Sequence, residues 1–240
     1  MYARRQFASA LKLFQQVLQL NPYTLPDPRI GIGLCLWALN HREKAKAAWE
    51  RSIEVVRDSF RTADFASYGE QNPSEWSGQL LLGLEALNAS KNPELSEDER
   101  IQELMIGSKL IERAFNSNQR NASAANALCD IFLRKGQHKR VRWFPLYTQD
   151  GALTKTLQAL KLAERTIQFA DTLTVLTDGY IRAGRVCHAQ GSYSDALKHY
   201  KQATEGQSKN VPAAIGFAQM QLRNGRPSFT ASFCVCADTL

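Results

Sequence analysis

The chain has 240 residues, of which 44% are hydrophobic and 22% charged, a balance typical of a soluble protein with a real core. No apolar run approaches the roughly 18 residues of a membrane span, and five scattered cysteines do not make a disulfide framework. The formal net charge of +7 favours acidic partners, but no block of like charge exceeds a few residues, so solvated helix faces account for the excess.

The first periodic segment, residues 6–22, has the spacing of a second helix in a helical repeat. A small residue, Ala10, is followed by Phe14 and Val17, and the segment ends at Pro22. Small residues let two helices approach closely, and the aromatic residue four positions later lies on the same face. Because this repeat pattern fits, we reject the reading of the arginine-bearing N-terminus as a transit peptide.

The second unit, residues 26–59, is more complete. Gly33 is the small residue of a first helix, and Ala45, Trp49 and Ser52 repeat the second-helix rhythm. The spacing from Ala10 to Ala45 lies close to the period of about 34 residues of the tetratricopeptide repeat (TPR). The pattern therefore predicts stacked helical hairpins.

Two looser units follow. In the first, Gly83 opens the repeat and Gly107, with Ile111 and Ala114, closes it; the extra residues 89–100 are polar and acidic with a central proline, which predicts an exposed loop. The second opens with a first helix at residues 121–136, in which Leu128, Cys129 and Gly136 are in register.

The second looser unit is interrupted after this helix. Pro145 falls where the second helix is due, and a proline inside a helix costs about 3 kcal/mol. Removing residues 141–158 restores the register, with Ala159, Ala163 and Thr166 at the packing positions. The segment also preserves the reading frame, and its edges are compatible with splice signals. We hypothesise that residues 141–158 are translated intron sequence; the alternative, a genuine loop insertion, stays open.

The strongest unit spans residues 177–210. Six of its residues occupy the small and aromatic positions of the repeat: Gly184, Gly191, Tyr193, Ala196, Tyr200 and Ala203. A match at six spaced positions is specific for the repeat, whereas a single pair of glycines would not be evidence for it. The first helix of one more repeat follows, and it ends at Asn224 and Gly225.

These units predict an all-α protein with the right-handed TPR solenoid fold. We expect a single solenoid over residues 1–226 and an irregular tail at 227–240, which we hypothesise to be read-through sequence. The approximate repeats are 1–22, 26–59, 76–121, 122–173 with the irregular insert 141–158, 177–210 and 211–226. Each hairpin buries its apolar face only against its neighbours, so stacking leaves a groove lined by the first helices.

The groove is the predicted partner-binding surface. Helical spacing places Asn126 and Asp130 on the exposed side of one first helix. The same spacing places Asp178, Arg182 and Arg185 on the exposed side of a later one. The expected partner is another protein, bound along an extended surface.

Other functional classes find little support in the sequence. The four histidines occupy turn or helix positions of the repeats, and no nucleophile, zinc or phosphate-loop motif is present, so we expect neither catalysis nor a cofactor. Cys234 and Cys236 have no second pair and no nearby histidine, so we expect no metal site. The basic cluster at residues 134–140 is explained as a solvated turn, and direct nucleic-acid binding is not expected.

A TPR module that grips a peptide C-terminus, as in co-chaperones and adaptors, is the alternative function. That mechanism needs converging Lys, Arg and Asn side chains. The first helices here offer Asn126, Arg182, Arg185 and Arg223, but Asp130 would repel a carboxylate.

Two segments, residues 2–55 and 165–225, resemble one large TPR protein in its fungal form. The family is the Cln-three-requiring (CTR-nine) subunit of the polymerase-associated factor complex, and the resemblance covers nearly the whole chain outside 141–158 and the tail. It implies a non-catalytic nuclear scaffold, present here as a fragment. The implied partners are the other subunits of that complex and, indirectly, RNA polymerase II and chromatin, with roles in transcription elongation and histone modification.

Overall fold

The structure is a computed structural model that describes residues 1–61, 73–137 and 149–223. Over these ranges it contains ten α-helices, one short 3-10 helix and no strand. The predicted all-α class is therefore confirmed. No helix in the described part of the chain is long and apolar enough to span a membrane.

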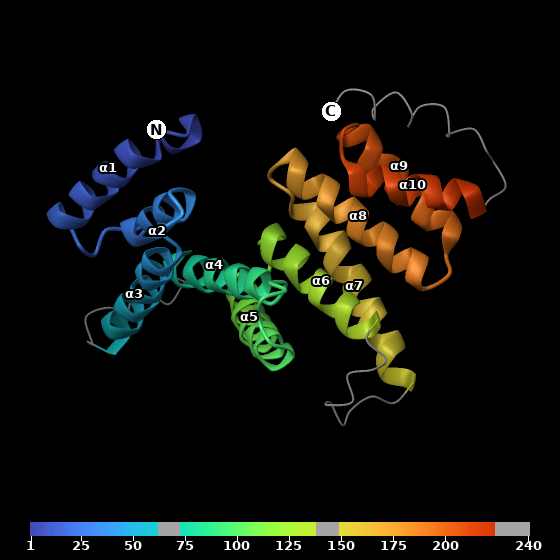
Figure 1. The fold of residues 1–240 in the computed structure, drawn as a ribbon, viewed down its shortest axis with the longest axis horizontal. Coiled ribbons are helices and arrows are strands. Elements are labelled where there is room, and N and C mark those ends of the chain that lie inside the picture. Colours follow the sequence, from blue (N-terminus) through green and yellow to red (C-terminus); the bar gives the residue numbers. More distant parts are fainter. Residues whose placement is uncertain (62–72, 138–148, 224–240) are drawn as a thin grey trace. The chain divides into compact units, whose positions relative to one another are not determined.

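The chain divides into two compact units, Met1–Gln119 and Arg120–Leu240. In unit 1, successive helices pack against each other in chain order (Figure 1). Its elements are η1 (Tyr2–Arg4), α1 (Phe7–Leu20), α2 (Pro28–Ala38), α3 (Arg42–Arg61), α4 (Pro73–Ala89) and α5 (Glu97–Ser117).

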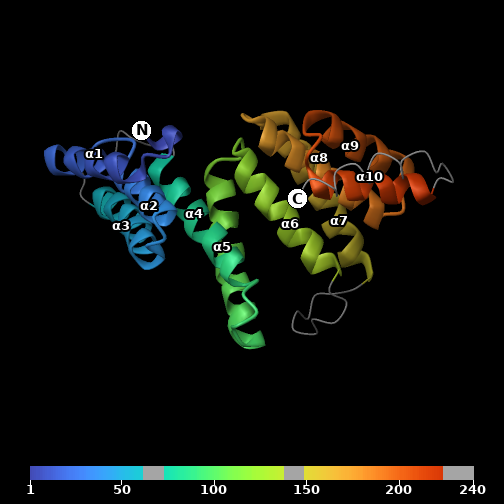
Figure 2. The same cartoon turned by 45° about the horizontal axis from the view of Figure 1, so that its top comes forward.

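Unit 2 has the same organisation, and Figure 2 shows α6 beside α7 and α8 beside α9. Its elements are α6 (Ala122–Gln137), α7 (Gln149–Phe169), α8 (Leu173–Ala189), α9 (Tyr193–Gly206) and α10 (Val211–Arg223). Helix α8 begins at Leu173, four residues before the expected start of its repeat at residue 177, and the repeat boundaries stay a prediction. The expectation of one continuous solenoid over 1–226 stays a prediction, and the tail at 227–240 lies outside the described residues.

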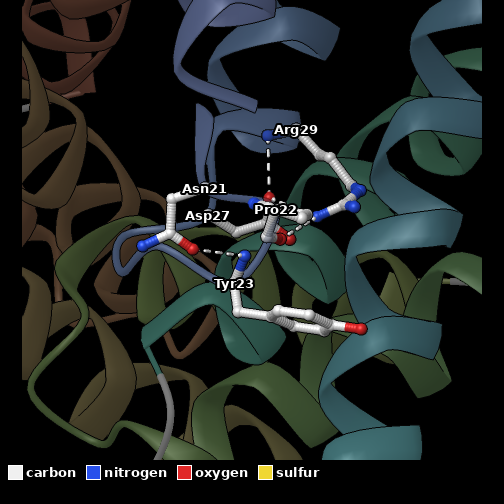
Figure 3. Close-up of polar contacts among 5 residues, drawn as sticks. All are labelled: Asn21, Pro22, Tyr23, Asp27 and Arg29. Carbon is white, nitrogen blue, oxygen red and sulfur yellow. Dashed lines mark hydrogen bonds and ion pairs between the residues drawn. The ribbon is translucent and has the colours of Figure 1, made fainter. Parts of the chain in front are cut away.

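Local signals in the sequence account for the helix ends. Asp27 caps α2, because its Oδ1 accepts a hydrogen bond from the Arg29 backbone N–H at 2.9 Å and Pro28 takes the first helical position. The Arg29 Nη1 donates a hydrogen bond to the Pro22 carbonyl at 3.0 Å, which ties the loop after α1 to the start of α2 (Figure 3). Between α8 and α9, Gly191 turns the chain with φ +81°, a conformation that favours glycine.

Paired helices meet where a large side chain of the second helix lies on a glycine of the first. Trp49 of α3 lies on Gly33 of α2, and Ile111 of α5 lies on Gly83 of α4. A Cβ added at Gly184 would stand 3.0 Å from the Tyr200 ring of α9. Any larger residue at these glycines would push the helices apart. These contacts have the register that the sequence predicts.

Aromatic residues of α1 and α9 pack on the first helix of the following repeat. Phe14 of α1 lies on Gly31 of α2, where an added Cβ would stand 2.5 Å from the ring, and Tyr200 of α9 lies on Gly216 of α10. The small residues expected at the close helix contacts are all buried: Ala10, Ala45, Ala196 and Ala203. In unit 2, buried side chains of α8, α9 and α10 form one hydrophobic cluster.

Two sequence expectations need correction, because residues expected to be irregular are helical. The acidic segment at 89–100 is a loop only until Ser96, whose capping box starts α5 at Glu97. In the predicted insert 141–158, residues 141–148 lie outside the described residues, and 149–158 form the first half of α7. The helix-breaking proline lies before residue 149, and leucine, alanine, lysine and glutamine after it favour a helix. The origin of the insert remains a hypothesis.

Candidate partner-binding groove

The candidate groove of unit 2 lies on α6 and α8, two first helices that contact each other. The Asn121 side chain caps α6 by accepting a hydrogen bond from the Ala124 backbone N–H at 2.8 Å. The Thr172 hydroxyl caps α8 by accepting from the Val175 N–H. Buried alanines at 122, 124, 125 and 127 let α6 pack closely, so its polar residues share the remaining face.

Three of the five predicted groove residues form one bridge between the helices. The Arg182 Nε donates to Asn126 Oδ1 at 2.5 Å, and the Arg182 Nη1 donates to Asp130 Oδ1 at 2.6 Å. The side chains of Arg182 and Asp130 are only 19% and 17% exposed. Such a charge-assisted pair, partly withdrawn from water, joins two repeats more firmly than a surface ion pair does.

The prediction that all five groove residues are exposed is therefore wrong. Asn126, Asp130, Asp178 and Arg182 are half-buried, and Arg185 is exposed. Helical spacing alone could not show that the long Arg182 side chain spans to the neighbouring first helix. Of the two groove arginines, Arg185 is the one offered to solvent, and Asp178 lies one turn before Arg182 on the same stripe.

A buried thiol lies beneath this polar surface. Burial raises the pKa of Cys129 to about 12, although the nearby positive charges of Arg182 and Arg185 act in the opposite direction. The Cys129 Sγ donates to the Ala159 carbonyl of α7 at 3.2 Å. The thiol is thus held neutral and serves the α6–α7 contact rather than nucleophilic chemistry.

Unit 1 contains a second polar bridge, which the sequence analysis missed. The Lys46 Nζ of α3 lies 3.1 Å from Glu85 Oε1 of α4 and 3.7 Å from Glu43 Oε1. Burial lowers the pKa of Lys46, but the hydrogen bond to Glu85 and the charges of Glu85, Glu43 and Glu103 outweigh it, so the pKa is raised. No local motif signals this bridge, because its partners lie on separate helices.

The structure describes only some of the residues considered for other kinds of site. No group of three His, Cys, Asp or Glu side chains suited to a metal ion occurs among the described residues. Cys234, Cys236 and the basic cluster from His138 to Arg140 lie outside them. His188 and His199 lie against Tyr193 and Tyr180 at ring-centroid distances of 5.8 and 6.3 Å, as packing residues of the α8–α9 pair.

A solved structure with the same fold comes from a thermophilic TPR protein of Thermus thermophilus. It matches 92% of this chain and 93% of its own, with a TM-score of 0.55 and 16% sequence identity. At this identity the likeness concerns the fold alone. Together with the glycine–aromatic contacts, it confirms the predicted TPR solenoid.

Sequence relatives extend this comparison, although no protein-family model matches the chain. The chain is 27% identical to "Tetratricopeptide repeat protein 1" of Schizosaccharomyces pombe over 92% of its length, and 24% identical to "RNA polymerase-associated protein CTR9" of Saccharomyces cerevisiae over 93%. "Protein CTR9 homolog" of Arabidopsis thaliana is also 24% identical, over 93% of the chain. The chain spans only 17–18% of the length of these three relatives. The resemblance seen in the sequence is thus confirmed: this is a TPR solenoid similar to part of the CTR9 proteins.

Proposed function

We propose that the chain is a non-catalytic scaffold that binds proteins within a polymerase-associated factor complex. The observation that carries this proposal is similarity, over more than nine-tenths of the chain, to relatives named RNA polymerase-associated protein CTR9. Stacked helical hairpins agree with it, because they offer extended surfaces for protein partners. On this proposal the chain acts in the nucleus, in RNA polymerase II elongation and chromatin modification.

Arg185 is the side chain that we propose for partner capture in the groove. It is exposed beside the closed Arg182–Asp130 bridge, so its charge can meet an acidic side chain of a partner. Arg182 has a different role on this view, because reversing its charge would set two carboxylates together between α6 and α8. Loss of binding in an Arg182 variant could therefore result from destabilised packing of α6 on α8 as well as from a lost contact with the partner.

The test is affinity purification of the tagged chain from nuclear extract of a fungal host, followed by mass spectrometry. Subunits of the polymerase-associated factor complex should co-purify with the wild type and with Lys209→Glu, an equal charge reversal at an exposed residue outside the groove face. Arg185→Glu should reduce their recovery severalfold. Recovery of no such subunit by the wild type would contradict the proposed complex, whereas equal recovery by both variants would contradict only the role of Arg185.

Capture of peptide C-termini is the competing function. The Arg182 guanidinium already donates a hydrogen bond to the Asp130 carboxylate. A peptide carboxylate would have to compete with Asp130 for this guanidinium, and the negative charge of Asp130 would repel it. We expect peptides with free and amidated C-termini to bind equally weakly in a fluorescence titration. A strong preference for the free carboxylate would favour the adaptor function instead.

A further inference from the structure

The loop between α1 and α2, residues 21–27, carries apolar side chains that the repeat packing leaves in solvent. Tyr23 is 70% exposed and Leu25 is 46% exposed. Pro22 and Pro26, which flank them, are exposed as well. A single apolar side chain on a protein surface is ordinary, whereas a contiguous group of them marks a site of interaction. This loop therefore forms an apolar projection.

Two other loops between repeats leave their second helices in the same way. The C-cap residues of α1, α5 and α9 share one backbone conformation, with φ between −147° and −139°. Each of them donates its backbone N–H to the carbonyl four residues earlier. The second residue after the C-cap is exposed in all three loops, and these residues are Tyr23, Arg120 and Lys209. Two loops thus hold a cation at this position, and the first loop holds an aromatic ring.

The exposure of Tyr23 does not depend on what precedes α1. The loops after α5 and α9 follow second helices that pack on their own first helices, α4 and α8. Arg120 and Lys209 are exposed although these first helices are present. The position therefore projects away from the hairpin that it follows, and a first helix packed on α1 would leave Tyr23 exposed too.

The loop is also longer than its two counterparts. Asn121 and Asn210 cap α6 and α10 at the third residue after the preceding C-cap. The cap of α2 is Asp27, the sixth residue after the C-cap of α1. The longer loop brings Leu25 beside Tyr23 without altering how α2 begins, because the cap itself is kept.

Buried polar contacts hold this loop in one conformation (Figure 3). The Arg29 Nη1 donates to the Pro22 carbonyl at 3.0 Å and to Asp27 Oδ1 at 3.2 Å. The side chains of Arg29 and Asp27 are only 14% and 6% exposed. The Tyr23 backbone N–H donates to Asn21 Oδ1 at 3.1 Å. A loop that is ordered before binding loses little conformational entropy when it meets a partner.

We propose that Tyr23 and Leu25 enter an apolar pocket on another subunit of the polymerase-associated factor complex. This inference rests on the proposed function and adds to it a contact in unit 1, separate from Arg185. A projecting loop fits a concave surface, and tyrosine is enriched among the residues that contribute most to binding. Its ring buries a large apolar area, while its hydroxyl can bond to a polar group at the rim of the pocket.

Charge separates this contact from the one proposed for Arg185. The charged residues that hold the loop, Asp27 and Arg29, form an ion pair that is largely buried. The projecting residues are uncharged, so salt should not weaken this contact by screening. The contact of Arg185 with an acidic side chain should weaken as salt rises.

The experiment is affinity purification of the tagged chain from fungal nuclear extract at low and at high salt, with subunit recovery measured by mass spectrometry. Tyr23→Lys installs the residue type that Lys209 has at the same loop position, so the fold should be unchanged. Recovery should fall about tenfold at both salt concentrations. Met105→Lys is the matched control, since Met105 is 45% exposed on α5, outside the loop.

Photocrosslinking tests the contact directly. Benzoylphenylalanine placed at position 23 should crosslink to one subunit of the complex. The same residue placed at position 209, which is equally a second residue after a C-cap, should give at least about tenfold less of that product. Circular dichroism should show the same thermal midpoint for Tyr23→Lys as for the wild type, because the ring is exposed.

The outcomes distinguish the two proposals. Recovery of no subunit by the wild type contradicts the proposed function, and this inference with it. If the wild type recovers the subunits and Tyr23→Lys recovers them equally, this inference alone is overturned. Equal crosslinking at positions 23 and 209, or none at position 23, also overturns it. So does a Tyr23→Lys chain that melts well below the wild type, because the ring would then belong to the repeat packing.

Discussion

The repeat formed by α8 and α9 has a second helix of regular length, whereas the repeats that contain α5 and α7 have longer second helices. All three place small residues at the same packing positions. Helix α9 begins at Tyr193, three residues before its small packing residue, Ala196. Helix α5 begins at Glu97, ten residues before Gly107, and α7 begins at Gln149, ten residues before Ala159. Both enlarged second helices are therefore extended at their N-terminus by seven residues, or about two turns.

The extension leaves the packing register unchanged. Gly107 and Ala114 of α5 are as well buried as Ala196 and Ala203 of α9, and Ala159 of α7 is fully buried too. The extra turns of α5 expose an apolar side chain, that of Ile101. A repeat thus accepts added residues where its second helix starts, and the packing residues that follow keep their register.

The largest effect that we expect concerns the thiol at the centre of the enlarged α6–α7 pair. With a pKa of about 12 against an ordinary value of 9.0, Cys129 should react with a thiol reagent at neutral pH about a thousandfold more slowly than an exposed thiol. Peptide mapping by mass spectrometry isolates this residue from the other cysteines. Rapid labelling of Cys129 in the folded chain would show that α7 does not pack on α6 in this register.

The same pKa shift has a pH dependence of definite sign. The folded state holds the Cys129 proton more tightly than the unfolded state, so this contribution to stability is present at neutral pH. It is lost as pH rises from 9.0 toward about 12. Cys129→Ala should remove this part of the alkaline loss of stability, as measured by urea unfolding across that pH range.

The small packing position allows a direct comparison of an enlarged and a regular repeat. A Cβ at Gly107 would stand 2.9 Å from the Gly83 carbonyl oxygen, which is backbone and cannot move aside. Gly107→Leu should therefore destabilise unit 1 by about 3 kcal/mol or more. Urea unfolding followed by circular dichroism measures the change, and a variant as stable as the wild type would contradict the α4–α5 contact.

The matched change in the regular repeat should be smaller. Ala196 is fully buried in α9 and already carries a Cβ that fits, so Ala196→Leu overpacks side chains rather than backbone. We expect a loss of about 1–3 kcal/mol in the same unfolding assay. An unmoved midpoint would show that Ala196 does not lie at a close helix contact.

A still smaller effect tests how the extension of α5 begins. The Ser96 side chain accepts from the Glu99 backbone N–H at 3.3 Å, and Glu99 Oε2 accepts from the Ser96 backbone N–H at 2.9 Å. Ser96→Ala should cost about 1 kcal/mol, while Ser96→Thr, which keeps the hydroxyl cap, should cost less. Equal losses in the two variants would argue that the capping box does not set the start of α5.

The sequence predicted the register because small and aromatic residues at fixed spacing act locally. Gly33, Gly184 and Tyr200 lie where that spacing places them, and Ala159 and Ala163 are buried as the deletion argument requires. The start of α2 could also have been predicted, because an aspartate followed by proline is a helix-start signal. These features depend on a few neighbouring residues.

The groove and the helix extensions were harder to predict. Whether Arg182 faces solvent depends on how near α6 lies to α8, which no spacing within one helix reveals. The proline and acidic residues of the inserts favoured loops, yet the capping box at Ser96 turned part of one insert into helix. The exposure of Arg182 was mispredicted because its side chain contacts a separate helix. The loop was mispredicted because the helix-start signal at Ser96 outweighed the loop-favouring residues before it.

The central claim is that the added residues leave the register of the repeat packing unchanged, and removing residues 141–158 tests it most directly. In the shortened chain, α7 would begin close to Ala159, as α9 begins close to Ala196. The account predicts a free energy of unfolding within about 1 kcal/mol of the full chain, because shortening a connection changes its closure entropy only slightly. A loss of about 3 kcal/mol or more would contradict it, and would show that the segment is part of the packed core.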